Sequence, residues 1–594
     1  MIPPWNSRFD LRNGNQEHEQ ATPPGAPSRW QTPLPQARRE RPDHSQSRRA
    51  PSSEETDRRR EHRAIGSRSW QFKVLRWQRR DQRVTGQRRQ RRWDSENRRP
   101  LAEARGPGKC PLSLHSPSSQ TAIAFGSREV RPTRPLKRIS QLLRTMTRVA
   151  LQALIALLLS AVGAAQKPNV VLIMADDLGY HDLGSYGHPK IRTPFLDQLA
   201  RDGLRLTSFY SGATVCTPSR MALMTGAYAA RCGWSKGVVG HKIDSNAGLS
   251  PEALTLADVY KSEGYATGMS GKWHIGDVGP CRPHVRNFDS AYYIGKSNNQ
   301  TTKLWRDGEL VEDPFSNRML TDQFTAEAVT FIKAHKHEPF FLYVPYTAPH
   351  FPVQAHPDWK GKSAFGVYGD VVEELDSRVG QILATLKAEG IDKNTIVVFM
   401  SDNGPEPNEQ ATADPYRGVK WDALEGGNRV PCIIRWPGVI PPGQTSNALI
   451  ASIDLLPTLC QACDIDLSSK TTGSPAIDGV SVWDTLLGKR TPHPRHELLI
   501  WHGMQGLHAI RVDDWKLFLS RPGAARHNAK DSPETVALLG EMRKGKGPVL
   551  FNLADDVGEL KDLSAEFPEK VEALRVLAEQ RLAEITRNVI PLVL

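Results

Sequence analysis

Three continuous apolar runs, each followed at once by polar residues, constrain the fold of this chain more than any other feature. They cover residues 168–175, 340–346 and 395–400. Because the runs are continuous rather than alternating, they predict strands that helices cover on both faces, as in a parallel sheet. Helical patterns lie between them at 194–202, 219–224, 253–263, 321–335 and 368–389. We therefore predict an α/β fold with a doubly wound, mostly parallel sheet flanked by helices.

The pattern changes after about residue 490. Segments 497–502, 507–512 and 515–519 are typical of short antiparallel strands, and 568–586 is typical of one amphipathic helix. The sequence thus predicts a catalytic domain at 166–490. It is followed by a smaller α+β subdomain with an antiparallel sheet at 491–594.

Each apolar run ends in residues that can do chemistry. Asp176 and Asp177 follow the first run, His350 lies just beyond the second, and Asp402 and Asn403 follow the third. Ligands of open parallel sheets bind beyond the carboxyl ends of the strands. Carboxylate and amide oxygens together suit a hard cation, Ca²⁺ or Mg²⁺. The alternative is that Asp and Asn after a strand are ordinary turn formers.

The basic character of the chain is confined to its first quarter. The formal net charge is +13. Residues 1–145 hold about 32 Lys and Arg against about 14 Asp and Glu, which leaves the remainder mildly acidic. Such a segment cannot bury enough apolar surface to offset its chain entropy, so we expect an Arg-rich disordered extension. A nucleic-acid-binding arm and an over-extended reading frame, with Met146 as the true start, are the alternatives.

Residues 146–165 have the layout of a secretory signal peptide. A short basic start at Met146–Arg148 precedes an apolar run at 149–162 and small residues at Ala164 and Ala165. A membrane anchor is the alternative, but the run is shorter than the roughly 20 residues that a spanning helix needs. We expect a mature chain from near Gln166 that is periplasmic or secreted, with no stable membrane anchor and no nucleic-acid partner.

Four motifs occur in order along the rest of the chain. The first is Cys216-Thr217-Pro218-Ser219-Arg220 with Thr225-Gly226, in which Pro218 suits the first turn of a helix that begins near Cys216. The others are Gly264–Gly276, then Arg417–Lys420 with Glu425–Pro431, and finally Leu550–Leu553 with Glu559–Leu563. Together they resemble the signatures of type I sulfatases, the formylglycine-dependent branch of the alkaline phosphatase superfamily, and most of all the arylsulfatase A group.

The resemblance implies a cysteine that a formylglycine-generating enzyme oxidises to an aldehyde, whose hydrate attacks sulfur. It implies a Ca²⁺ ion rather than Mg²⁺. The implied catalytic residues are Cys216, Arg220, His274 and His350; the implied substrate-binding residues are Lys272, Lys420 and Ser297; the implied metal ligands are Asp176, Asp177, Asp402, Asn403 and the modified Cys216.

The predicted function is hydrolysis of sulfate esters to an alcohol and inorganic sulfate. The alternative enzyme on this fold is a phosphodiester or phosphonate monoester hydrolase. An inactive sulfatase-like binding protein is the hypothesis from another class, and it would be expected to have lost Cys216 or the metal residues. The expected substrate is a sulfated small molecule or glycan. Its leaving group is expected to contact loops at 234–248, 279–318, 352–366 and 404–416.

Overall fold

The computed structural model describes residues 142–152 and most of the chain from residue 166 onwards. The gaps after 166 are 408–409, 472–475, 490–491 and much of 523–543. The predictions for residues 1–141 and 153–165 lie outside the described residues. Residues 142–152 form a helix with exposed side chains. Within the described ranges, no helix combines the length and the apolarity needed to cross a membrane.

Ten strands of the described chain form one large sheet. In spatial order they are β13 (Gln444–Ser446), β2 (Leu204–Leu206), β12 (Cys432–Arg435), β11 (Thr395–Ser401), β1 (Asn169–Ala175), β10 (Phe340–Pro345), β6 (Ala266–Lys272), β7 (Ser290–Ile294), β8 (Leu304–Arg306) and β9 (Glu309–Glu312). The run β11-β1-β10-β6-β7 is parallel throughout, whereas β12, β8 and β9 pair antiparallel with their neighbours. The three predicted strands are therefore β1, β10 and β11, at the centre of the sheet.

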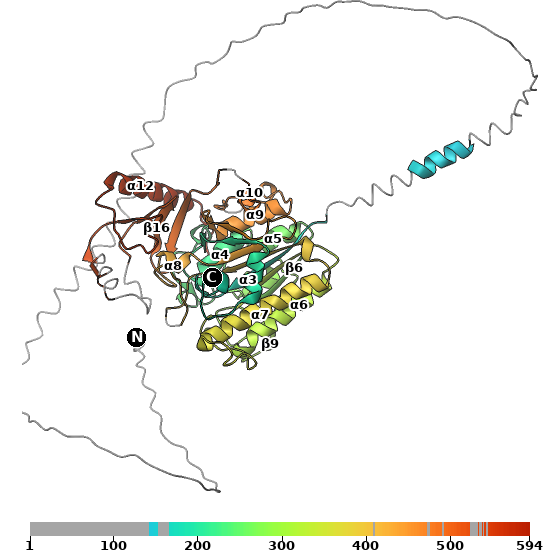
Figure 1. Ribbon diagram of the computed structural model, residues 1–594, viewed down its shortest axis with the longest axis horizontal. Coiled ribbons are helices and arrows are strands. Elements are labelled where there is room, and N and C mark those ends of the chain that lie inside the picture. Colours follow the sequence, from blue (N-terminus) through green and yellow to red (C-terminus); the bar gives the residue numbers. More distant parts are fainter. Residues whose placement is uncertain are drawn as a thin grey trace, which may run out of the picture. The chain divides into compact units, whose positions relative to one another are not determined.

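Helices cover both faces of this sheet (Figure 1). On one face lie α3 (Pro194–Arg201), α6 (Leu320–Ala334) and α7 (Gly366–Ala388); on the other lie α4 (Cys216–Thr225), α5 (Leu256–Ser262) and α9 (Leu455–Ala462). Successive side chains of β1 enter the two cores in turn: Val170 and Leu172 pack into one, Val171 and Ile173 into the other. The predicted doubly wound, mostly parallel architecture is confirmed.

A second, smaller sheet follows in the C-terminal part of the chain. Its strands β15 (Glu497–His502), β16 (Gly506–Val512), β17 (Trp515–Phe518) and β18 (Val549–Asn552) pair antiparallel in sequence order. Helix α12 (Pro568–Ile585) packs against β16 and β17. The short elements are β3 (Phe209–Tyr210), β4 (Val238–Val239), β5 (Lys242–Ile243), α8 (Glu425–Asn428), β14 (Ile450–Ala451) and α10 (Trp483–Leu486). The α+β subdomain is confirmed, while its exact boundaries stay predictions.

A fully buried ionic cluster joins this subdomain to the large sheet. The Nζ atom of Lys516 on β17 lies 2.9 Å from Oε1 of Glu425 on α8 and 2.7 Å from Oε1 of Glu559. Glu559 also accepts a hydrogen bond from the backbone N–H of Glu425, at 2.7 Å. All three side chains are inaccessible to solvent. Lys516 thus bridges two carboxylates, while Arg429 Nη1 lies 3.1 Å from Glu425 Oε2 as a second cation for that carboxylate. Glu425 begins the second part of the third motif.

Replacing Lys516 by Met should destabilise the protein by about 3–5 kcal/mol, because two buried carboxylates lose their shared cation. Urea unfolding followed by circular dichroism measures the change. Lys561→Met, at an exposed lysine of the same subdomain, should shift stability by less than about 0.5 kcal/mol. Equal stability of the two variants would contradict the role assigned to Lys516.

Candidate active site

The carboxyl ends of five neighbouring parallel strands deliver side chains to one place. In sheet order the strands are β11, β1, β10, β6 and β7. The residues that follow them, or end them, are Asp402 and Asn403, Asp176 and Asp177, His350, Lys272 and His274, and Ser297. The site was predicted at the ends of three strands, and in the structure it lies at the ends of five. Every site residue named from the sequence lies close to at least one other of these residues.

Cys216 is the first residue of α4, so its side chain sits at a helix N-terminus. There, backbone N–H groups and the helix dipole favour an anion. The thiol is buried, and burial raises the pKa of Cys216 to about 11. An unmodified Cys216 is therefore a protonated thiol at neutral pH, which makes it a weak nucleophile.

Oxygen atoms of four residues converge below Cys216. Asn403 Nδ2 donates to Asp177 Oδ1 at 2.7 Å, and the backbone N–H of Asp177 donates to Asp402 Oδ1 at 3.1 Å. Ligand atoms of Asp176, Asp177, Cys216 and His350 all lie within 4.8 Å of one another. Among the described residues, Asp176 Oδ1 and Asn403 Oδ1 are buried acceptors without a hydrogen-bond donor. Unpartnered buried oxygens of Asp176 and Asn403, beside the carboxylates of Asp177 and Asp402, fit a hard divalent cation.

The electrostatics of this cluster agree with that fit. Burial and the neighbouring Asp176 carboxylate raise the pKa of Asp402. Burial alone would also raise the pKa of Asp176, but Lys272, His350 and Arg220 hold it far below its usual range. Like charges packed this closely in a water-poor site need cations to remain ionised.

Three buried cations surround the same cluster. Arg220 donates from Nε and Nη2 to Asp402 Oδ2, at 3.0 and 2.8 Å. Lys272 Nζ lies 2.6 Å from Asp176 Oδ2, and Lys420 Nζ lies 2.7 Å from Asp177 Oδ2. Burial alone would lower the pKa of Lys420, but Asp177 raises it well above its usual value. Arg220 and Lys420 are therefore positively charged, and each of the three basic side chains lies within hydrogen-bond distance of a carboxylate.

Two buried imidazoles complete the site. His274 Nε2 lies 3.2 Å from the Val239 carbonyl, and its Nδ1 is buried without a partner in the described part of the chain. Burial, aided by Lys272 and Arg220, lowers the pKa of His274 well below its usual value. Burial also lowers the pKa of His350 to about 4. Both rings are thus neutral near pH 7 and can accept a proton.

Ser297 contacts both Lys272 and His350. Its hydroxyl accepts a hydrogen bond from Lys272 Nζ at 3.1 Å and lies 3.3 Å from His350 Nε2. The Ser297 hydroxyl is therefore close enough to contact an anion that Lys272 binds. The structure places this residue with the others even though its loop matches the family signatures less closely.

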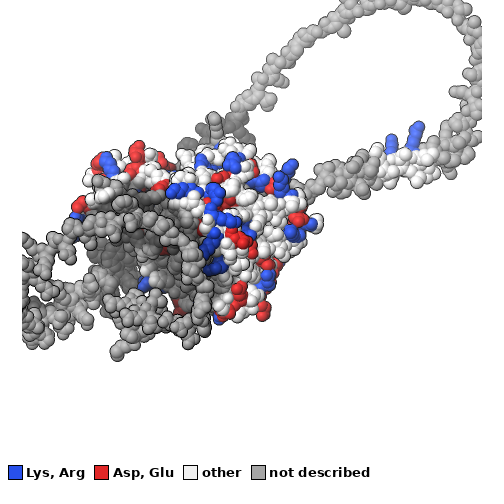
Figure 2. All heavy atoms as spheres, turned by 60° about the horizontal axis from the view of Figure 1, so that its bottom comes forward, with Lys and Arg blue, Asp and Glu red and all other residues white. Residues whose placement is uncertain are grey.

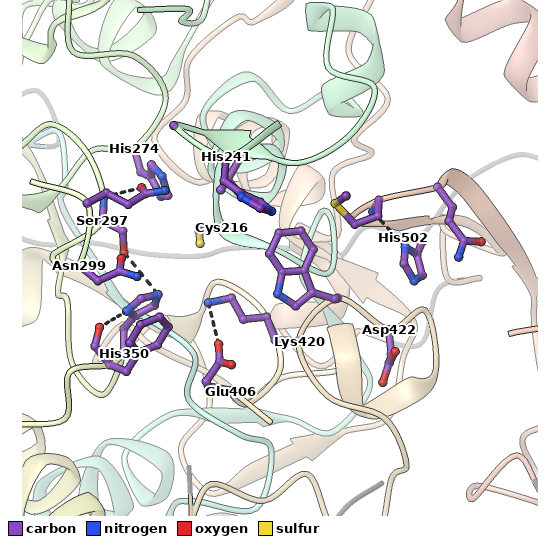
Figure 3. A pocket seen from close by; sticks show the side chains of 17 residues that line it. Cys216, His241, His274, Ser297, Asn299, His350, Glu406, Lys420, Asp422 and His502 are labelled. Carbon is purple, nitrogen blue, oxygen red and sulfur yellow. Dashed lines mark hydrogen bonds and ion pairs between the residues drawn. The ribbon is translucent and has the colours of Figure 1, made fainter. Parts of the chain in front are cut away.

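A cavity of about 640 Å³ opens above Cys216. Figure 3 shows Cys216 facing this space, with His274 and His350 on one side and Lys420 on the other. Three of the loops predicted to contact a leaving group do line the cavity, through His241, Asn299 with Gln300, and Glu406; the loop 352–366 does not.

Sequence reasoning missed two parts of the cavity wall. The turn between β15 and β16 contributes His502, Met504 and Gln505, so the C-terminal subdomain completes the cavity. This turn carries no motif, and only pairing in the folded chain brings it to the site. Gly503 in the turn allows the approach, because a Cβ there would lie 2.5 Å from the Trp421 ring.

Trp421 is the other missed residue, and its backbone is unusual. Its φ is +81°, in the left-handed region that favours glycine and that a bulky side chain rarely adopts. Its indole packs beside Val215, Cys216 and Val238 and lines the cavity. Strain of this kind persists where the surroundings enforce it, and it gathers at functional sites. A signal was present in the sequence, since Trp421 directly follows Lys420 of the third motif.

Comparison with known proteins agrees with these observations. A family model described as Sulfatase matches residues 168–465, and one described as the C-terminal region of aryl-sulfatase matches 493–591. Arylsulfatase A of Bos taurus is 34% identical over 469 residues, which cover 72% of this chain and 90% of the relative. N-acetylgalactosamine-6-sulfatase of Mus musculus is 32% identical over 480 residues, covering 72% and 88%.

Solved structures show the same fold. The PsFucS1 sulfatase from Pseudoalteromonas sp. matches with a TM-score of 0.63 and 26% identity, covering 75% of this chain and 95% of its own. Ps i-CgsB in complex with k-i-k-neocarrahexaose matches with a TM-score of 0.59 and 28% identity, covering 71% and 94%.

Trp421→Gly should raise KM for 4-methylumbelliferyl sulfate about tenfold and leave kcat within about twofold, because the ring lines the cavity in which a leaving group would be bound. Glycine tolerates the backbone at this position, so the variant should fold. Steady-state kinetics test the expectation, with Trp359→Gly, outside the cavity, as the control. A fall in kcat at unchanged KM would refute it.

Proposed function

The chain belongs to the sulfatase family and is a sulfuric ester hydrolase, and we propose that Cys216, once oxidised to formylglycine, supplies its nucleophile. The observation that carries the proposal is the setting of Cys216. It is buried at the start of α4 beside Lys420, and its thiol pKa is raised far above neutrality by burial. A thiol in this setting is inert, whereas an oxygen nucleophile faces an assembled anion site.

Formylglycine supplies a hydrated aldehyde, in which one hydroxyl can attack sulfur and the other allows sulfate to be expelled afterwards. A serine at position 216 has only one hydroxyl and could not complete the second step. The chain's own residues position and charge-balance this group. Arg220, whose guanidinium bridges Asp402 and the Lys272 carbonyl, stabilises it at the base of the cavity.

Sulfate oxygens are bound by Lys272, Lys420 and Ser297. A sulfate ester gains negative charge on its oxygens in the transition state, so fixed positive charges stabilise that state most. The two ammonium groups are already held by Asp176 and Asp177, so little reorganisation is needed. Low exposure to water increases the strength of each contact.

Proton transfer falls to the two histidines and Lys420. His274 presents an unpartnered Nδ1 in a buried, neutral ring, and we assign it the removal of the proton that accompanies sulfate release. Of the two candidates for donating a proton to the leaving oxygen, His350 and Lys420, the neutral ring of His350 leaves Lys420 as the donor near pH 7. Lys420 carries that proton at neutral pH, because Asp177 raises its pKa.

Asp176, Asp177, Asp402 and Asn403 would hold the metal ion, and we propose Ca²⁺ rather than Mg²⁺. The ion would supply positive charge to a sulfate oxygen as a Lewis acid. Ca²⁺ accepts the irregular sets of carboxylate and amide oxygens that strand ends provide, whereas Mg²⁺ demands near-octahedral geometry and retains water.

Two further proposals concern the export and the maturation of the protein. The signal-like segment at 146–165 supports export to the periplasm or the exterior, without a stable membrane anchor. The Cys-x-Pro-Ser-Arg motif supports a formylglycine-generating enzyme as a partner during maturation.

Co-expression with a formylglycine-generating enzyme should convert Cys216 to the aldehyde, detected by mass spectrometry of its peptide, and should switch on hydrolysis of 4-methylumbelliferyl sulfate. Cys216→Ala should lower kcat/KM at least about 10³-fold, because the nucleophile is lost. Cys432→Ala, at a buried cysteine of β12, is the control and should keep its activity. A faster reaction on bis(4-nitrophenyl) phosphate would favour the phosphodiesterase alternative.

Ca²⁺ should raise the thermal unfolding midpoint of the chelator-treated protein by several degrees at saturation, because it binds the folded state alone. Asp177→Asn should abolish this shift. Asp182→Asn should keep it, since that buried carboxylate holds backbone N–H groups outside the cluster. A larger shift with Mg²⁺ at equal concentration would refute the preference for Ca²⁺.

A further inference from the structure

A second cavity adjoins the active-site cavity and is strongly basic. It measures about 620 Å³ and is lined by Arg282, Lys296 and Lys303, with Asp277 as its one acidic side chain. Lys296 Nζ lies 3.9 Å from Asp277 Oδ1, so the three basic side chains leave an excess of two positive charges in the cavity. None of these four residues takes part in the chemistry described above.

The two cavities share a wall. Asn299 and Gln300 line both of them. Lys296 lines the second cavity, and the next residue, Ser297, lines the first and contacts Lys272. A ligand whose sulfate lies at Ser297 therefore needs to pass only one short loop to reach the cations.

This loop is held in a defined shape. The backbone N–H groups of Gln300 and Thr301 donate to the Ser297 carbonyl, at 2.8 and 3.2 Å. The loop packs closely on its neighbour, because a Cβ at Gly295 would lie 2.2 Å from Cβ of Asp277. The seven residues from Ser297 to Lys303 are joined by six peptide steps and span at most about 22 Å even when extended. Lys303 is therefore within reach of a sugar chain whose reacting sulfate lies at Ser297.

The other lining groups suit a sugar. Asn298, Thr301 and Thr302 offer amide and hydroxyl groups that can pair with sugar hydroxyls. Trp305 adds an aromatic surface, against which the Arg282 guanidinium packs 4.7 Å from the ring centroid. A purely apolar leaving group, such as an aryl or steroid ring, would gain nothing from excess positive charge. A neighbouring sulfated sugar would gain both charge pairing and hydrogen bonds.

We propose that this second cavity is a subsite for a further sulfate group, so that the enzyme acts on an oligosaccharide carrying sulfate on the sugar next to the one being desulfated. The inference rests on the proposed function, because it takes the cavity above Cys216 as the reacting site. It assigns Lys296 and Lys303 as specificity-determining residues. Arg282 shapes the cavity through its hydrogen bond to the Asp277 carbonyl.

The test uses sucrose octasulfate as a polysulfated disaccharide and inorganic sulfate as a single anion. The double variant Lys296→Gln/Lys303→Gln should weaken binding of sucrose octasulfate about tenfold, measured by calorimetry and as inhibition of 4-methylumbelliferyl sulfate hydrolysis. Inhibition by inorganic sulfate, and kcat/KM for the aryl sulfate, should stay within about twofold of wild type. Lys333→Gln, which removes one exposed positive charge of α6 outside both cavities, is the control.

Three results would overturn the subsite. The first is wild-type protein that binds sucrose octasulfate no better than inorganic sulfate. The second is a double variant that binds it as tightly as Lys333→Gln does. The third is equal loss of aryl sulfate hydrolysis, which would place the lysines in the reacting site. Failure of the proposed function is distinct, since it would appear as no aryl sulfate hydrolysis in wild type, while calorimetry still reports on the subsite.

Discussion

The concentration of unlike charges at one buried edge of the sheet is the constraint on which the rest of the site depends. Asp176, Asp177 and Asp402 are all inaccessible to solvent, as are Arg220 and Lys272. Charges removed from water are stable only when each has partners at close range. Five parallel strands that end side by side provide those partners, because each strand end is fixed by the ladder of its neighbours.

The same principle extends beyond the reacting atoms. Lys420 reaches Asp177 from a loop that returns to the C-terminal subdomain at Glu425, where Lys516 and Glu559 hold it. Arg417, in the same loop, donates to the Glu559 carbonyl at 3.0 Å. The subdomain therefore supports one side of the active site with a buried ionic cluster and lines it with the turn after β15. Both contributions come from subdomain residues more than 280 positions away in sequence from Cys216.

The central fold and the class of reaction could be predicted from the sequence, but two strands of the site, β6 and β7, could not. β1, β10 and β11 are continuous apolar runs, so their burial on both faces is visible directly. β6 carries Lys272 and occupies the same sheet, yet its sequence includes Gly268 and Gly271. A Cβ at Gly268 would lie 2.6 Å from the Phe331 ring, and Gly271 has a φ of +147° with the Pro345 carbonyl oxygen 1.9 Å from its ideal Cβ position. Close packing required glycines, and glycines remove the strand signal.

The distribution of charged residues along the sequence likewise does not show which of them the fold brings to the site. The excess of Arg lies in residues 1–145, and in the part of the face that Figure 2 leaves uncovered, basic and acidic side chains of the described chain are intermixed. Net charge alone therefore says little about where anions bind. The basic groups placed for anion binding are few: Arg220, Lys272 and Lys420 are buried against the carboxylates, whereas Lys296 is partly buried and Lys303 is exposed beyond the shared loop. The three buried cations act most strongly on an anionic substrate, because buried charge is screened far less than charge on an open surface.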